Sequence, residues 1–163
     1  MTEPETSSNV VKPSIAKLPL AAALVALVGI ADAIYLTVHH YAADPVPCGA
    51  GFDCEMVLTS PYATLSGFIG DVPTIGDIPL SVLGAAAYFI AFSLALLAAF
   101  GDRRMWRLFG IQATIMAIFS GVLIYVQAAR IHAFCQFCLI SATTTFILFL
   151  IYLASALIKP RSQ

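Results

Sequence analysis

The chain has 163 residues, only 10% of them charged, and its formal net charge is −1. Because a soluble domain carries about 25% charged residues, this composition, with a mean hydropathy of +0.92, excludes an ordinary soluble protein. It favours one compact membrane domain. No run of basic residues indicates a nucleic-acid partner.

Four apolar segments are each long enough to cross a bilayer about 30 Å thick. They cover residues of about 18–38, 80–100, 108–129 and 133–158. We therefore predict a single all-α membrane domain at 18–158, a bundle of four transmembrane helices, with a disordered tail at 1–17 and a short polar tail at 159–163. A cleaved signal peptide is the alternative for the first segment, since Ala31-Asp32-Ala33 loosely resembles a cleavage site.

The loop at residues 39–78 is the long region that is not strongly apolar, and it carries Cys48 and Cys54. Apolar residues recur at helical spacing across 55–65, although Pro61 interrupts them. This segment is too short to span a membrane. The pattern predicts a short helix lying at the membrane interface.

Positive charges are distributed unevenly between the ends of the predicted spans. Seven of the eight Lys and Arg residues fall on the side of the two termini, and only Arg130 falls on the other. The positive-inside rule then predicts a multi-pass protein of the cell inner or plasma membrane with both termini in the cytoplasm. The loop at 39–78 and all four cysteines would face the extracytoplasmic side, where disulfides are permitted.

The four cysteines form two pairs on that predicted face. Cys135 and Cys138 are a Cys-x-x-Cys pair at the start of the last apolar segment, and a helix N-terminus favours the reactive thiolate. The loop pair, Cys48 and Cys54, is placed to meet a soluble partner. Thiol–disulfide exchange could then carry two electrons from the partner through the loop pair to the helix pair. A membrane-soluble quinone fits as the last acceptor.

Two other interpretations of the polar residues stay open. The cysteines could form structural disulfides or bind zinc, with His39, His40 and His132 nearby, although the spacing of the loop pair does not resemble a zinc ribbon. Asp32 lies inside the first span, and an intramembrane carboxyl group is a functional-site hypothesis by default. His39 and His40 are interpreted as interface residues.

At this point several motifs, taken in order, resemble one family. The residues that carry the resemblance are Gly29 through Asp32, Tyr35-Leu36-Thr37, Cys54-Glu55-Met56-Val57-Leu58-Thr59-Ser60-Pro61-Tyr62-Ala63, Gly76-Asp77-Ile78-Pro79-Leu80-Ser81-Val82-Leu83-Gly84, Tyr88 and the Cys135/Cys138 pair. Together, over roughly residues 20–158, they resemble the bacterial form of the vitamin K epoxide reductase family. The resemblance implies a four-helix bundle around a quinone, capped by the loop helix.

The resemblance also implies a role for each cysteine. Cys138 would react with the quinone, Cys135 would receive electrons from Cys54, and Cys48 would exchange with the soluble partner. The resting pairing stays open between two separate disulfides and an intermediate joining Cys54 to Cys135. No metal is expected.

Three further residues are predicted to accompany Cys138 at the quinone. Ser60 matches a family serine expected to support the site by hydrogen bonding, although a serine here could equally cap local backbone. Tyr62 and Phe137 are predicted quinone contacts. The type of quinone, whether menaquinone, ubiquinone or phylloquinone, is left open.

Two positions depart from the animal members of the family. Leu80 and Ala142 stand where those members carry an Asn and a Tyr associated with the vitamin K ring oxygens. The departures favour plain quinone reduction over epoxide reduction, which remains the alternative. Many bacterial relatives continue into a thioredoxin-like domain, whereas this chain stops at Gln163, so the expected thioredoxin-like partner is a separate protein. The function that we expect is a membrane thiol oxidase that supports disulfide formation.

Overall fold

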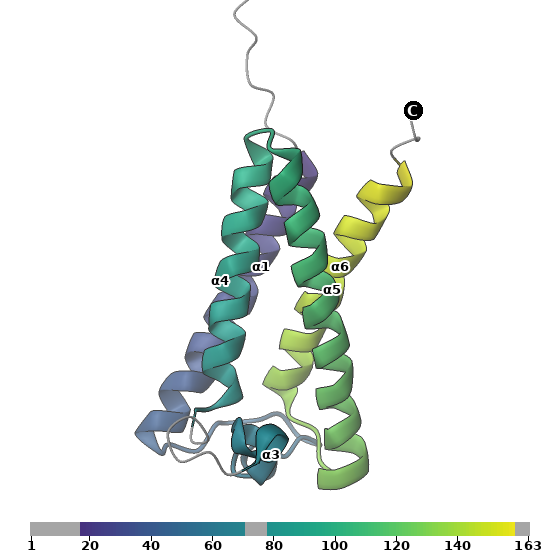
Figure 1. Ribbon diagram of the computed structural model, residues 1–163. Helices are drawn as coiled ribbons and strands as arrows, with labels where there is room; N and C mark the ends of the chain where they lie inside the picture. The colour runs from purple at the N-terminus through teal and green to yellow at the C-terminus, as the bar shows by residue number, and fades with distance from the viewer. Residues whose placement is uncertain (1–16, 71–77, 159–163) are drawn as a thin grey trace, which may run out of the picture.

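The structure is a computed structural model that describes residues 17–70 and 78–158. Four long helices dominate it (Figure 1), namely α1 (Lys17–Ala42), α4 (Leu80–Ala99), α5 (Arg103–Val126) and α6 (Gln136–Ile158). All four are long and apolar enough to cross a membrane. Within the described ranges there is no β-strand, and the predicted all-α bundle is confirmed. The predicted tails lie, apart from Lys17, outside the described residues.

The long helices pack in a closed ring. Helix α1 contacts α4 and α6, and α5 contacts the same two helices from the opposite side. The contact of α1 with α4 is made by small buried residues, Ala22, Ala26 and Ala33 on one helix and Ala91 and Ala95 on the other. Small side chains let the backbones approach closely, which is how helices associate where lipid offers no hydrophobic drive.

Tyr88 joins three of the helices in the middle of the bundle. It is buried, and its hydroxyl group donates to the carbonyl of Ser141 at 2.6 Å and lies 2.7 Å from the Thr145 hydroxyl. The ring lies directly against Gly29 of α1, where a Cβ atom would overlap it. Gly29 is therefore required by packing, because any side chain would displace the tyrosine.

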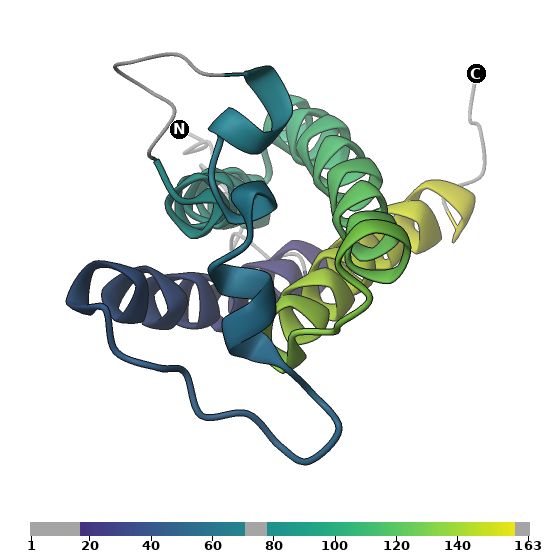
Figure 2. The ribbon, with the colours of Figure 1, turned by 90° about the horizontal axis from the view of Figure 1, so that it is seen from below.

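The connection between α1 and α4 crosses one end of the bundle (Figure 2). The helix predicted over residues 55–65 is divided into α2 (Cys54–Leu58) and a 3₁₀ turn, η1 (Pro61–Ala63), and is followed by α3 (Ser66–Ile69). The division falls at Pro61, because proline forces the residue before it out of the helical region. Ser60 is accordingly extended, with φ −66° and ψ 153°.

The last turn after α5 is a π-helix, η2 (Gln127–Ile131), and it lies at the same end of the bundle as the short helices. It ends at His132, which has a left-handed backbone with φ 58°. The chain reverses there and enters α6. The α4–α5 turn, with Arg103 and Arg104 next to it, lies at the opposite end of the bundle, beside the start of α1.

Candidate redox site

Cys48 and Cys54 form a disulfide in the segment that leads into α2, with their Cα atoms 6.1 Å apart. Cys54 is the first residue of the helix, and Asp53 caps it by accepting a hydrogen bond of 3.0 Å from the backbone N–H of Met56. The sulfur pair is therefore held at a fixed helix start. Cys54 is fully buried, whereas Cys48 is only partly buried, so the two ends of the disulfide face different surroundings.

Cys135 and Cys138 are free thiols at the start of α6. The backbone N–H of Cys138 donates to the sulfur of Cys135 at 3.4 Å, and the carbonyl of Cys135 accepts from Leu139. Cys135 thus occupies the position of an N-cap residue, with sulfur where an oxygen usually accepts.

This geometry favours a thiolate at Cys135. The pKa of its thiol is lowered, chiefly because the Cys138 thiol donates to it. Backbone N–H groups at Cys138 and Phe137 also face its sulfur, and together these donors outweigh burial, which raises the pKa. The expected activation of a cysteine by a helix N-terminus therefore falls on the first residue of the pair.

Gln127 fixes the backbone of the cysteine turn. Its side-chain Oε1 accepts a hydrogen bond of 3.0 Å from the backbone N–H of Cys135, and the residue is only 4% exposed. Gln127 begins the π-helical turn, a feature that often occurs at functional sites. Sequence reasoning did not select this residue. The signal was available, because it is a polar amide near the end of an apolar span.

Two hydrogen bonds join the loop to the cysteine turn. The N–H of Asp53 donates to the carbonyl of Phe134 at 3.0 Å, and the N–H of Gly49 donates to Oε1 of Gln136 at 3.0 Å. Between these bonds lies a buried cluster centred on Cys54, Val57, Ile131 and Cys135, with Cys48 and Cys138 packed against it. All four predicted cysteines are thus gathered in one place.

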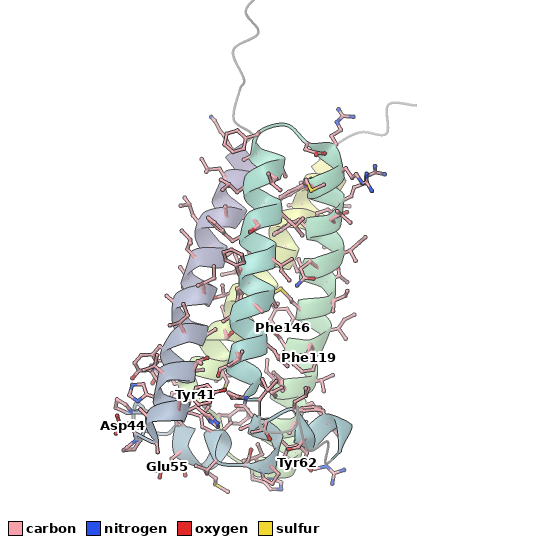
Figure 3. The ribbon with its side chains drawn as sticks, turned by 60° about the vertical axis from the view of Figure 1, so that its left-hand side comes forward. Tyr41, Asp44, Glu55, Tyr62, Phe119 and Phe146 are labelled. Atoms are coloured by element: carbon pink, nitrogen blue, oxygen red, sulfur yellow. A yellow bond between two sulfur atoms is a disulfide. The ribbon has the colours of Figure 1, made fainter. Side chains whose placement is uncertain are left out.

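A cavity of about 280 Å³ lies within the helix ring beside this cluster. Cys138 lines it, and α2 and η1 contribute Val57, Leu58, Ser60, Tyr62 and Ala63 to its wall. In Figure 3, Tyr62 lies at the loop end of the bundle and Phe119, a further wall residue, lies farther along α5. The volume is close to the lower end of the range for small-molecule sites, about 300–1,000 Å³.

The other predicted contacts differ in their placement. Ser60 lines the cavity, and its hydroxyl group donates to the carbonyl of Val57 at 2.7 Å, so it also caps local backbone. Phe137 is not part of the cavity wall. Its ring packs on Tyr35 of α1, with centroids 4.9 Å apart.

The two positions that depart from the animal proteins, Leu80 and Ala142, both line the cavity. Polar side chains also line the wall. They include Asp32, Ser81, Gln112 and the linked hydroxyl groups of Tyr88 and Thr145. Among residues 17–70 and 78–158, no group of three His, Cys, Asp or Glu side chains could hold a metal ion.

A four-helix membrane bundle with a disulfide packed beside two thiols, next to an apolar cavity, belongs to the class of membrane redox proteins. The model of the Vitamin K epoxide reductase family matches residues 20–153, so the chain is a member of that family. The predicted resemblance is confirmed. The family consists of oxidoreductases that couple disulfides to quinones in membranes. A search of curated proteins finds no match to this chain.

Proposed function

We propose that the protein is a membrane thiol oxidase. It takes two electrons from a reduced thioredoxin-like protein and passes them through two cysteine pairs to a membrane quinone. The observation that carries this proposal is the packing of Cys54 against Cys135 in one buried cluster, with Cys138 opening onto the cavity. That arrangement offers a continuous route from a loop disulfide to a site for a lipophilic molecule.

The first step is exchange at the loop. A thiolate of the soluble partner would attack Cys48, the less buried end of the disulfide, and release Cys54 as a thiolate. The second partner thiol would then close the partner's own disulfide and free Cys48. The partner is oxidised by two electrons and the loop pair is reduced by two.

The second step is exchange between the pairs. When Cys135 and Cys138 are joined as a disulfide, the Cys54 thiolate would attack Cys135 and release Cys138 toward the cavity. Closing the Cys48–Cys54 disulfide then frees Cys135. A loop disulfide beside two free thiols, the arrangement in the structure, would be the product of this step.

The third step reoxidises the helix pair. A quinone would supply a two-electron acceptor, and its ring suits a largely apolar cavity that also offers polar groups to its oxygens. Cys138 faces that space, whereas Cys135 is buried behind it with a lowered pKa. Cys138 would pass the electrons across the cavity, and the Cys135 thiolate would then close the disulfide on the Cys138 sulfur.

The side of the membrane follows from charge. Lys17, Arg103, Arg104 and Arg107 belong to the end of the bundle opposite the cysteines, whereas Arg130 lies at the cysteine end. By the positive-inside rule the arginine-rich turn would be cytoplasmic. The cysteine end would then face an oxidising compartment, where a separate thioredoxin-like protein would introduce disulfides into exported proteins.

Reduction of a plain quinone is favoured over reduction of an epoxide. The side chains of Leu80 and Ala142 in the cavity wall offer no hydrogen-bond donor at the two positions that the animal proteins use for ring oxygens. Supplying the purified protein with a quinone and with its epoxide, in parallel, tests this choice. We expect quinol from the first and no product from the second, and equal turnover of both would reverse the assignment.

The function itself is tested by turnover in detergent or vesicles. With a reduced thioredoxin-like protein as donor, we expect the wild-type protein to form quinol and the Cys138→Ala protein to form none. The Cys48→Ala protein should lose oxidation of the protein donor, while a small dithiol could still reach Cys54 directly. Quinol formation by Cys138→Ala at the wild-type rate would refute the proposed path.

A further inference from the structure

Asp32 is an acidic side chain in the wall of the cavity. The proposed thiol exchange gives this carboxyl group no role. It lies on α1, ten residues before the helix ends at Ala42, so it is about 15 Å from that end at 1.5 Å per residue. It shares the cavity with Cys138, Tyr88 and Ser141. Carboxyl groups at such depth are rare in membrane proteins and face cavities or partners.

No partner within the described residues accounts for this carboxyl group. Its Oδ2 atom is buried and accepts no hydrogen bond there. The one basic side chain in the cavity wall is His40, which lies eight positions farther along α1, about 12 Å away by helical rise. Among residues 17–70 and 78–158, Asp32 is therefore neither part of an ion pair nor a cap, and no structural role there explains it.

The surrounding wall limits the forms that this group can take. Leu36, Leu83, Ala87 and Ala142 line the same cavity as Asp32. An isolated carboxylate in such surroundings is expensive to bury, whereas a neutral carboxyl group is much less so and carries a proton that it can donate. A ligand oxygen in the cavity would supply the missing hydrogen-bond partner.

We propose that Asp32 is the proton-donating group of the quinone site. Its carboxyl group would hold a proton at an oxygen of the bound ring and release that proton as the ring is reduced. This inference rests on the proposed function. It adds a catalytic residue on α1, a helix that packs against α6, which carries Cys138.

The proton and electron balance is complete without a further oxidant or reductant. Forming the disulfide from the Cys135 thiolate and the Cys138 thiol releases two electrons and one proton, and conversion of a quinone to a quinol takes up two of each. Asp32 would give the second proton to a ring oxygen and recover it from water, which took up the Cys135 proton when that thiolate formed. A positioned acid of this kind contributes about 10²–10⁴-fold to a rate.

The kinetic test is a single turnover of reduced protein. The protein is reduced with dithiothreitol, freed of reductant, and mixed with a short-tailed quinone while quinol formation is followed. We expect Asp32→Asn, which keeps the shape but has no acidic proton, to slow quinol formation by about 10²-fold. Asp32→Glu should recover part of the rate. Reduction of the Cys48–Cys54 disulfide by dithiothreitol should be unchanged in both variants.

A matched control separates this effect from the loss of any polar group in a span. Ser93→Ala removes a hydroxyl group from α4 that bonds to the carbonyl of Phe89 and does not line the cavity. We expect Ser93→Ala to form quinol at the wild-type rate. If Asp32→Asn forms quinol as fast as Ser93→Ala does, the proposal is wrong.

An infrared measurement decides the question even if the variants fold poorly. In the wild-type protein, the C=O stretch of a protonated carboxyl group should shift when the quinone is added, and Asp32→Asn should lack that shift. Absence of any such band in the wild-type difference spectrum would overturn the proposal. Failure of the proposed function would look different, because the wild-type protein would then form no quinol at all.

Discussion

The backbone N–H of Asp53 donates a hydrogen bond to the carbonyl of Phe134 across 3.0 Å. Each of these residues directly precedes a buried cysteine, Cys54 on one side and Cys135 on the other. Because this bond lies between backbone atoms, it sets the loop against the cysteine turn independently of side-chain identity. The two cysteines that we propose to exchange are therefore brought together by the fold itself.

Cross-linking tests this relationship. In the double variant Cys48→Ala/Cys138→Ala, only Cys54 and Cys135 remain, and we expect them to form a disulfide rapidly on mild oxidation. The control Cys54→Ala/Cys138→Ala leaves Cys48, which is only partly buried and packs against the edge of the cluster, and it should cross-link more slowly. Mass spectrometry of unreduced peptides measures both. Faster cross-linking in the control would reverse the proposed roles of Cys48 and Cys54.

The lowered pKa of Cys135 makes a prediction about pH. In the reduced protein, the first thiolate should appear below the ordinary cysteine pKa of about 8.5, as followed by ultraviolet absorbance of the thiolate. Since the Cys138 thiol is the largest cause, Cys138→Ala should move the midpoint upward. Cys135→Ala should remove the early titration altogether. An unchanged midpoint in Cys138→Ala would contradict this account of the pair.

The same shift affects stability. Because the folded state favours the thiolate, Cys135 stabilises the reduced fold above the unfolded-state pKa of about 8.5, and that contribution is lost as the pH falls through the lowered folded-state value. As the pH rises from the folded-state pKa to the unfolded-state pKa of Cys135, the wild-type protein should therefore gain stability relative to Cys135→Ala. Thermal unfolding of both proteins across this range measures the difference.

The sequence allowed the bundle to be predicted because long apolar runs have one stable form in a membrane, the helix. It also predicted that the cysteine pairs share an end, since the number of spans and the position of each pair decide that. The family model supports the assignment over residues 20–153. The helical bundle and the shared end of the two cysteine pairs follow from local composition and from the order of segments along the chain.

Other features depend on contacts between distant residues. The hydrogen bond from the backbone N–H of Cys135 to the side chain of Gln127 depends on a π-helical turn, and the spacing of apolar residues does not predict such a turn. Phe137 was predicted at the quinone, yet its ring packs on Tyr35, because consecutive residues of a helix are turned by about 100° and Phe137 does not share the direction of Cys138. The motif at residues 76–77 lies outside the described part of the chain, so its contribution stays a prediction.

Gly29 offers a test of how Tyr88 is held. In Gly29→Ala the new methyl group would overlap the tyrosine ring, so we expect a loss of about 1–3 kcal/mol in stability, as overpacked cores show. We also expect weaker quinone binding, because Tyr88 lines the cavity. Thermal unfolding and the KM for quinone measure the two effects.

The control for that variant is Gly121→Ala on α5. Apart from the adjacent residues and the backbone of its own helix, no atom of the described residues lies within 4 Å of the position where its Cβ would be placed. Alanine is favoured over glycine inside a helix by roughly 0.5–1 kcal/mol, so this variant should be as stable as the wild type or slightly more so. Equal destabilisation by both substitutions would mean that contact with Tyr88 is not the cause.

The proposed soluble partner can reach the cysteines only if the cysteine end of the bundle lies outside the cytoplasm. In a background with all four cysteines replaced by Ala, we place single cysteines at two exposed sites, Ala50→Cys in the loop and Arg103→Cys beside the α4–α5 turn. An impermeant maleimide added to intact cells should label the first and not the second, because the arginine-rich turn is expected in the cytoplasm. Permeabilised cells should show both labelled, which controls for reactivity. The opposite pattern would place the disulfide in a reducing compartment, where a thiol oxidase would have no oxidised products to sustain.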